Sequence, residues 1–303
     1  MDYDYIVKNR YAMKILTQEP KEPLESQPID ITFTEYQPTK PVFSIVMPIH
    51  NQEAILSKHI QAIFQHTTDR PYELICILDA CSDKSEQAIQ DILRSPLPPL
   101  LTSVLILTAH IPLFETSSDN IGFLCSRGKY LLEIQADLEM TETGYNMKLL
   151  QPFLLFPNVI GVSGRCCHGI TYNEGVGKLG ADIEKPLPAS LDKHAFYVAE
   201  TCNRGPLLLD HEKVRQLGYL DEANYFLDNS DHDLFARAYH TKRWICGYVP
   251  IEFLSLLQYG STRKPRNALN ERFFQQYQRE KTGNGFLRTY HPTTRPIQKI
   301  RLE

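Results

Sequence analysis

The sequence predicts an α/β domain whose mostly parallel sheet is flanked by helices. The first observation is a series of short apolar runs, FSIVMPI at 43–49, ELICILD at 73–79 and SVLILT at 103–108. Such runs are typical of parallel strands that are buried on both faces. The second observation is a pattern of helical period after the first run, formed by Ile55, Leu56, Ile60, Ile63 and Phe64. Strands that alternate with helices in this way indicate an α/β fold.

The same alternation continues along the chain. The helix after the second run should begin near Asp83, where Glu86 would complete a capping box. Two further strands are predicted at 130–136 and 159–163, and helices near 144–155, 210–218 and 231–241. Residues 164–200 are rich in Gly and Pro, so we expect mainly loop there. Apolar residues at helical spacing predict an amphipathic helix over 267–281.

Composition divides the chain into three parts. Residues 1–40 hold four prolines among many polar residues, and we expect an N-terminal arm. Residues 41–255 carry the alternating pattern and are expected to form a single domain. Residues 256–303 are expected to be a basic and partly helical C-terminal extension, because 263–303 hold ten Lys and Arg against three Glu. A basic tail can meet phosphates, an anionic membrane surface or an acidic acceptor, and a solvated tail is the alternative.

Charge, hydropathy and cysteine content exclude several classes of protein. A formal net charge of -4 gives no reason to expect nucleic-acid binding. No run approaches the roughly 18 apolar residues of a membrane span, and the first residues are not those of a secretory signal. Seven cysteines without a C-x-x-C pair are expected to be reduced thiols. We therefore expect a cytoplasmic protein, which the basic tail would allow to lie against a membrane.

Polar and acidic residues follow three of the predicted strands. His50 and Asn51 follow the first, Asp79 ends the second, and Asp137 and Glu139 follow the fourth. Ligands of an open α/β sheet bind beyond these strand ends. An acidic site that must hold anions implies a divalent cation between them, and oxygen ligands suit Mg²⁺ or Mn²⁺ bridging a diphosphate.

Four segments in order resemble the family 2 glycosyltransferases, which have the Rossmann-like GT-A fold. They are SIVMPIHNQEAIL, ICILDACSDKSE, DNIGFLCSRGKYLLEIQADLEM, and NRGPLLLDHEKVRQLGYLDE with DNSDHDLFARA. The resemblance covers roughly residues 41–250. It implies a single GT-A catalytic domain of hexosyltransferase type. Such a domain moves a sugar from a nucleotide-diphosphate sugar to an acceptor hydroxyl with inversion.

The first two segments hold the nucleotide in this family. The resemblance implies that Pro48, His50 and Asn51 line the base and ribose pocket and that Asp79 bonds the base or ribose. Asp83 is expected to do likewise, or to cap the helix that follows.

The family's D-x-D element falls on Gln135, Ala136 and Asp137. Asp137 matches the position that binds the metal, whereas Gln135 replaces the first Asp and is expected to bond ribose hydroxyls. Strand alternation would place 135, 137 and 139 on one face. Glu139 would then supply the missing carboxylate, the alternative being an ordinary loop acid.

The last segment carries the expected general base. Asp231 matches the base of inverting members, and capping the helix over 231–241 is its structural alternative. Ser230 stands where the family has Glu. Asp233 is expected near the same pocket. Arg204 and Gly205 lie in the region that faces the donor sugar and acceptor, where Arg204 would contact a phosphate or an acidic sugar, or form a surface salt bridge.

The resemblance favours a UDP-sugar as donor, with a GDP-sugar as the alternative, and a glycan, lipid-linked or protein acceptor. Two other functions stay open. A non-catalytic module that binds nucleotide sugars would explain Gln135 and Ser230 at family acid positions. A sugar nucleotidyltransferase shares the sheet and the metal chemistry, but it needs a Gly-rich basic loop after the first strand, and HNQEAIL is not such a loop.

Overall fold

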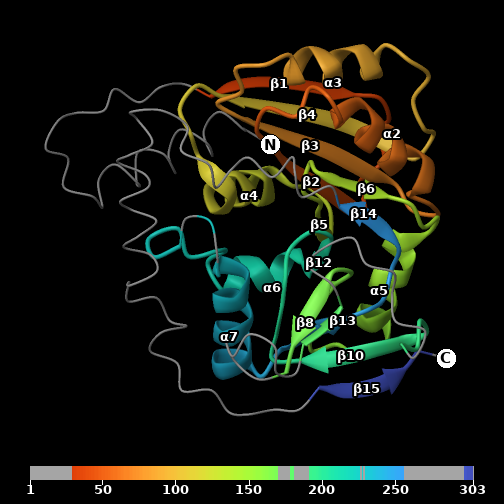
Figure 1. Ribbon diagram of the computed structural model, residues 1–303, viewed down its shortest axis with the longest axis vertical. Helices are drawn as coiled ribbons and strands as arrows, with labels where there is room; N and C mark the ends of the chain where they lie inside the picture. Colours follow the sequence, from red (N-terminus) through yellow and green to blue (C-terminus); the bar gives the residue numbers. More distant parts are fainter. Residues whose placement is uncertain are drawn as a thin grey trace, which may run out of the picture.

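The computed structural model describes residues 29–169, 178–180, 191–225, 227, 229–255 and 297–302 (Figure 1). The helix predicted over 267–281 lies outside the described residues, as does most of the basic extension. Within the described residues, no helix is both long and apolar enough to cross a membrane.

A ten-stranded mixed sheet organises the molecule, in the order β1-β4-β3-β2-β5-β12-β7-β13-β10-β15 (Figure 1). Neighbours among β4, β3, β2 and β5 run parallel, as do β7 and β13, and the remaining pairs are antiparallel. In chain order the strands are β1 Asp30–Glu35, β2 Phe43–Ile49, β3 Tyr72–Asp79, β4 Leu101–Ala109, β5 Tyr130–Glu133, β7 Val159–Ser163, β10 Ala195–Ala199, β12 Leu207–Asp210, β13 Ile245–Tyr248 and β15 Gln298–Arg301.

The apolar runs predicted as strands form the parallel centre of this sheet. All eight residues of β3 are buried, as expected for a strand covered on both faces. Alternate residues of β2 and β3 enter different cores: Ile45 and Leu74 join one, and Val46 and Ile75 join the other. The predicted fold, an α/β sheet flanked by helices, is confirmed.

Helices cover both faces of the sheet. The helices are α2 Leu56–His66, α3 Ser85–Leu93, α4 Phe114–Cys125, α5 Tyr145–Leu155, α6 His211–Gln216 and α7 Ser230–Lys242. Residues of α2, α3 and α5 belong to one core, and residues of α4, α6 and α7 belong to the other. Three helices therefore cover each face of the sheet among the described residues, and α4 lies on the same face as α7.

Two small sheets complete the fold. β6 Leu138–Met140 pairs with β14 Phe253–Ser255. β8 Cys166–His168 pairs with both β9 Lys178–Gly180 and β11 Thr201–Cys202. The expectation that 164–200 is mainly loop is therefore wrong for β8, β9 and β10, because each finds an antiparallel partner that the local sequence does not indicate.

The two ends of the described chain also join the large sheet. Residues 30–35 were expected within the N-terminal arm, but β1 pairs along its whole length with β4. Ile31 and Phe33 alternate with Thr32 and Thr34 there, a pattern that suits an edge strand. β15 pairs with β10 at the opposite edge. Both strands thus satisfy backbone groups of a sheet edge that would otherwise be unpaired.

Candidate active site

Side chains of the expected nucleotide pocket tie the loop after β2 to the loop after β3. His50 Nδ1 lies 2.6 Å from the carbonyl oxygen of Asp79, and Asn51 Nδ2 lies 3.1 Å from His50 Nε2. A carbonyl oxygen only accepts and an amide N–H only donates, so the His50 ring carries its proton on Nδ1 and accepts through Nε2. The Asn51 side-chain oxygen accepts from the Ser82 backbone N–H at 2.8 Å. Pro48, half-buried in β2, precedes this group, so the residues predicted for the base and ribose lie together.

The Asp79 carboxylate holds the start of α4. It is buried and accepts from the backbone N–H groups of Leu113 at 2.5 Å and Phe114 at 3.1 Å. Carboxylates are favoured at helix N-termini because the first N–H groups have no partner within the helix. The structure thus gives Asp79 a structural partner, and its bond to a base or ribose stays a prediction.

Asp83 joins the same two loops from the other side. Its carboxylate accepts from the backbone N–H of Glu53 at 2.9 Å and of Ser85 at 3.0 Å, while the Glu53 carboxylate accepts from Lys84 N–H at 2.8 Å. The predicted capping box with Glu86 is wrong. The helix begins at Ser85, and the Glu86 side chain instead accepts from Gln90.

The segment that matches D-x-D lies in a turn. β5 ends at Glu133, and the Leu138 N–H donates to the Gln135 carbonyl at 3.0 Å. The alternation expected to place 135, 137 and 139 on one face is therefore wrong, because the strand does not extend that far. Ala136 is buried, and its carbonyl oxygen lies 2.7 Å from His59 Nδ1, which explains the polar residue on the apolar face of α2.

The Gln135 amide bridges two charged side chains. Its Nε2 donates to Glu115 Oε1 at 2.6 Å, and its Oε1 accepts from the Arg165 guanidinium at 2.8 Å. Both ends of the amide therefore have protein partners, whereas the sequence predicted bonds to ribose.

Asp137 suits a metal that is shared with a diphosphate. Burial raises the pKa of its carboxyl, although the Arg165 guanidinium, its own backbone N–H and His59 act in the opposite direction. No other side chain of the described residues donates a hydrogen bond to this carboxylate. The described part of the chain holds no cluster of three His, Cys, Asp or Glu able to bind a metal ion. Mg²⁺ and Mn²⁺ need only one or two protein carboxylates where phosphates and waters complete the shell, so Asp137 fits such an ion.

The Glu139 carboxylate has a lysine as its partner and is not bonded to Asp137. Glu139 is in β6, and its carboxylate pairs with Lys58 Nζ at 2.6 Å. This pairing agrees with the alternative that Glu139 is an ordinary acid rather than a second metal ligand.

Asp231 is a buried carboxylate in the first turn of α7. One oxygen accepts from the Arg204 backbone N–H at 3.0 Å and the other from His232 N–H at 2.8 Å. Burial by itself would raise its pKa, but His232, the Arg204 guanidinium and the two N–H donors hold the pKa below its ordinary value. Asn229, with φ 69°, occupies the N-cap position, so the structure does not make Asp231 the N-cap. The carboxylate is thus ionised at neutral pH, as a general base must be.

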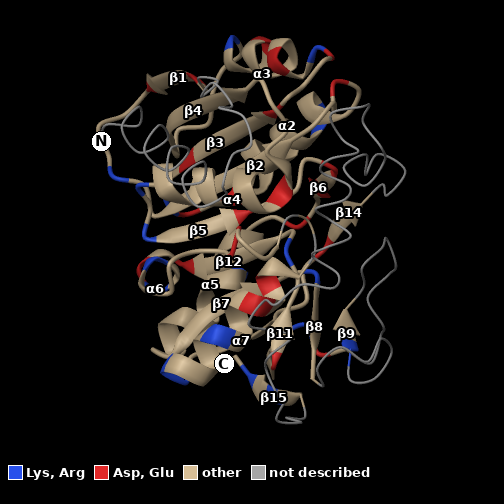
Figure 2. Ribbon diagram, turned by 90° about the vertical axis from the view of Figure 1, so that its left-hand side faces the viewer, with Lys and Arg blue, Asp and Glu red and all other residues tan. Residues whose placement is uncertain are grey.

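Arg204 is buried, and its guanidinium forms hydrogen bonds to three other residues. Its guanidinium donates to Asp119 at 2.6 Å, to the Leu227 carbonyl at 2.7 Å and to Ser230 Oγ at 3.0 Å. It is 4% exposed, so the alternative of a surface salt bridge is wrong, whereas its contact with a phosphate or an acidic sugar stays a prediction. Figure 2 shows acidic residues on α4 and α7, the two helices that face this side chain.

Gly205 and Asp233 have structural partners. The Gly205 N–H donates to the buried Glu133 carboxylate at 2.7 Å, and its φ of 64° favours glycine. Asp233 is fully buried and pairs with Arg237 at 2.7 Å one turn along α7. Asp233 thus has an arginine partner within its own helix, and its place near the pocket stays a prediction.

Sequence reasoning missed four charged residues of the site, namely Glu115, Asp119, Glu133 and Arg165. Burial raises the pKa of Glu133 well above its ordinary range and that of Asp119 to about 7, in spite of Arg204. A signal was present for Glu133, because it is the one acid in the apolar run 130–136. No comparable signal marks Asp119, since its polar neighbours in the sequence do not indicate a buried helix.

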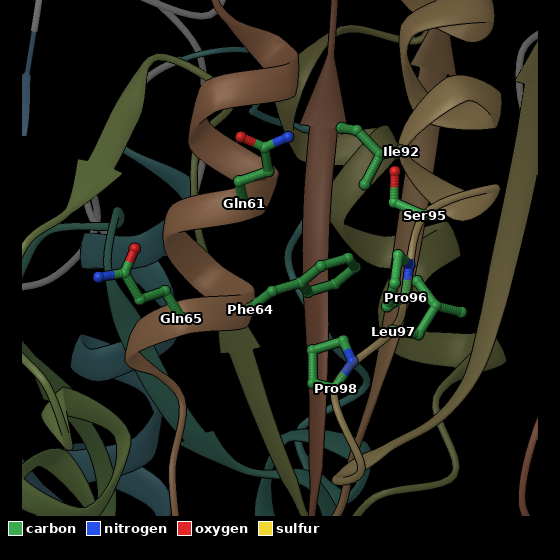
Figure 3. Close-up of a pocket in the computed structure, with 8 residues that line it drawn as sticks. All are labelled: Gln61, Phe64, Gln65, Ile92, Ser95, Pro96, Leu97 and Pro98. Carbon is green, nitrogen blue, oxygen red and sulfur yellow. The ribbon is translucent and has the colours of Figure 1, made fainter.

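A separate hollow of about 400 Å³ lies between α2 and the segment after α3 (Figure 3). Phe64, Ile92 and Pro98 line it together with Gln61 and Gln65. These residues follow the middle of α2, whereas the helix begins next to the C-terminal ends of the strands. The hollow therefore lies toward the N-terminal ends of the central strands, away from the candidate site.

The sequence was compared with models of protein families. Residues 44–174 match the model of the family described as Glycosyl transferase family 2. This part of the chain is therefore similar to the family 2 glycosyltransferases. The match includes Asp79, Asp137 and Arg165, whereas Arg204 and Asp231 lie beyond its end. A comparison with curated protein sequences found no match.

Solved glycosyltransferase structures share the fold. The mannosyltransferase PcManGT from Pyrobaculum calidifontis, in complex with GDP-Man and Mn²⁺, superposes with a TM-score of 0.52 at 14% identity, covering 82% of this chain and 63% of that one. GalNAc-T7 with UDP, GalNAc and Mn²⁺ gives 0.55 at 14% identity, covering 73% and 44%. TarS of S. aureus in complex with UDP gives 0.50 at 11% identity, covering 70% and 60%. The chain thus spans less than two thirds of each of these proteins, and the likeness confirms a GT-A glycosyltransferase fold.

Proposed function

We propose that this glycosyltransferase moves a sugar from a nucleotide-diphosphate sugar to an acceptor hydroxyl with inversion, and that Asp231 is the general base. The observation that carries the proposal is the state of the Asp231 carboxylate. It is buried, held by two backbone N–H groups, and its pKa lies below the ordinary value. A carboxylate kept ionised in a buried site can take a proton from a bound hydroxyl.

The reaction is a single displacement. The acceptor oxygen forms a bond to the anomeric carbon while its proton passes to Asp231. The bond from that carbon to the donor diphosphate breaks, and the diphosphate takes the electron pair. Attack from the face opposite the leaving group inverts the anomeric centre. The role of Asp231 is then to keep a proton acceptor at a fixed position, because an uncharged hydroxyl is a weak nucleophile.

The donor diphosphate is proposed to lie at the turn after β5. Asp137 would hold a divalent cation there, Mn²⁺ or Mg²⁺, which when bound neutralises charge on the departing diphosphate. Arg165, whose guanidinium is bonded to Gln135 and acts on Asp137, adds a fixed positive charge at the same place. His50 and Asn51 lie at the neighbouring strand ends, where the base and ribose would bind.

A UDP-sugar is the favoured donor and a GDP-sugar the alternative, since complexes with UDP, with UDP and GalNAc, and with GDP-Man occur among proteins of this fold. The acceptor is proposed to be a glycan, a lipid-linked sugar or a protein. All seven cysteines are free, which supports a reducing compartment and hence the cytoplasm. The basic extension would allow contact with a membrane surface.

The proposal is tested by thermal shift and donor hydrolysis across UDP-, GDP- and dTDP-sugars, each with Mn²⁺ and with EDTA. We expect one donor to stabilise the protein and to be hydrolysed slowly, both only with metal. Tight donor binding without hydrolysis or transfer would instead indicate a binding module, for which Gln135 and Ser230 at acid positions would be the reason. Release of pyrophosphate from a nucleoside triphosphate and a sugar phosphate would indicate a nucleotidyltransferase.

A further inference from the structure

A buried cluster of charged groups surrounds Arg204 between α4, β5 and α7. We call it the Arg204 cluster, and its other members are Glu115, Asp119, Glu133, Ser230 and Asp231. Asp119 and Glu133 are wholly buried, and each has one carboxyl oxygen without a partner among the described residues. The carboxyl groups outnumber the single guanidinium, so the cation is shared among them.

Arg204 holds the proposed base in two ways. Its backbone N–H donates directly to the Asp231 carboxylate at 3.0 Å. Its guanidinium bonds Ser230 Oγ at 3.0 Å and the Leu227 carbonyl at 2.7 Å, and therefore fixes the chain on the N-terminal side of the base. The bond to Asp119 at 2.6 Å anchors the same guanidinium to α4. One residue thus joins the first turn of α7 to the helix that packs on the centre of the sheet.

The cluster also connects the base to the donor end of the site. Arg204 Nε lies 3.7 Å from Glu115 Oε1, which accepts from the Gln135 amide at 2.6 Å. Gln135 in turn accepts from Arg165 at 2.8 Å. A continuous series of bonds and ion pairs therefore runs from Asp231 through Arg204 to the turn that carries Asp137.

We propose that Arg204 is a positioning residue for Asp231, which it orients toward the donor end of the site and stabilises as a carboxylate. This inference rests on the proposed function, because it assigns a purpose to the base. Besides Arg204, the titratable groups that act on Asp231 are His232 on α7, Asp119 on α4 and Cys202 on β11. Glu115 on α4 and Glu133 on β5 act on the Arg204 guanidinium that Asp231 shares with them. The carboxyl groups among them favour a protonated Asp231, so removal of the guanidinium should favour protonation too.

The test compares variants that separate charge, geometry and folding. Arg204→Met alone would leave Asp119 buried without its cation, and it is therefore made in an Asp119→Asn background. The decisive pair is Asp119→Asn against Asp119→Asn/Arg204→Met. Arg204→Lys keeps the charge but cannot bond three acceptors in the fixed fork of a guanidinium. Arg215→Met, on an exposed arginine paired with Glu212, is the matched control.

Four quantities are measured for each variant: Tm, donor Kd, kcat, and the pH profile of kcat/KM, with the donor that the thermal-shift test identifies. The acidic limb is the low-pH side of this profile, where protonation of Asp231 stops transfer. For the decisive pair we expect the added Arg204→Met change to move the acidic limb to higher pH and to lower kcat by roughly tenfold or more, with an unchanged donor Kd. Arg204→Lys should lower kcat while keeping the acidic limb near that of the wild type. Arg215→Met should match the wild type in all four.

A folded double variant whose acidic limb coincides with that of Asp119→Asn overturns the inference, whether or not kcat falls, because a purely structural residue would give that result. Asp231→Asn in the wild-type background distinguishes the two proposals. If Asp231→Asn abolishes transfer while the two variants of the decisive pair have the same acidic limb, only the role of Arg204 is wrong. If it leaves transfer intact, the proposed base and the role of Arg204 are both wrong.

Discussion

Asp119→Asn should remove part of the pH dependence of the free energy of unfolding. Asp119 is wholly buried in α4, and burial raises its pKa from 3.8 to about 7 despite the neighbouring Arg204. Between these values the unfolded chain releases the proton and the folded protein keeps it. Since stability falls with pH wherever the unfolded state binds fewer protons, the wild type loses stability from about pH 4 to about pH 7.

The size of this effect follows from the shift of about three pKa units. At roughly 1.4 kcal/mol per unit, the loss is on the order of 4 kcal/mol and is absent from Asp119→Asn. Asparagine keeps an oxygen that can accept from Arg204. However, it places an N–H₂ group where the carboxyl oxygen has no partner among the described residues, at a cost of about 1–3 kcal/mol. The variant should therefore be less stable than the wild type at pH 4 and more stable above pH 7.

The assay is urea denaturation of the wild type and of Asp119→Asn at pH 4.5, 6 and 8. The free energies of unfolding are compared only where the two proteins have equal m-values. Asp91→Asn is the matched control, because Asp91 is exposed on α3 and pairs with Arg94 at the surface. It should differ from the wild type by less than about 0.5 kcal/mol at every pH. Parallel curves for the wild type and Asp119→Asn would refute the reasoning, because they would mean that Asp119 ionises equally in both states.

Three further variants test other parts of the structure. Glu73→Gln should lower the free energy of unfolding in urea by about 2–3 kcal/mol. The reason is that the buried Glu73 carboxylate accepts from the backbone N–H of Arg127 at 2.6 Å and from its guanidinium at 2.8 Å. A loss under about 0.5 kcal/mol would contradict this. Gly161→Ala should cost about 1–3 kcal/mol, since the added Cβ would lie 2.4 Å from Phe235 in the core beside β7. An unchanged Tm would show that Phe235 moves freely aside. Asp137→Asn should make donor affinity the same with Mn²⁺ and with EDTA, and a retained metal effect would remove Asp137 from the metal site.

The sequence predicted the strands at the centre of the sheet because their burial leaves a local pattern. β2, β3 and β7 are continuous apolar runs, and the structure confirms them. β1 and β15 were not predicted, because an edge strand is defined by its partner, which lies far away in the sequence. The helix α4 was missed for a related reason. Its buried polar residues are satisfied by distant groups, as Asn120 is by the Leu220 backbone.

The same distinction applies to the site. Resemblance to a family predicted roles for Asp137 and Asp231, since each occupies a matching position in a motif. It did not predict that Arg204 would be buried beside Asp231, because that contact joins a loop before β12 to α7 and α4. Nor did it predict that Gln135 would bond Glu115 and Arg165. The sequence could name candidate residues for the chemistry, but the neighbours of those residues depend on the three-dimensional fold.

The central claim is that Asp231 takes the proton of the acceptor hydroxyl, and Asp231→Asn tests it most directly. Donor affinity and transfer are measured on the same preparation, with the donor identified by thermal shift. We expect the donor Kd to stay unchanged and kcat for transfer to fall by about 10²–10⁴-fold, the usual effect of removing a general base. Transfer at the wild-type rate by a variant that binds the donor normally would contradict the account and assign the proton to another group.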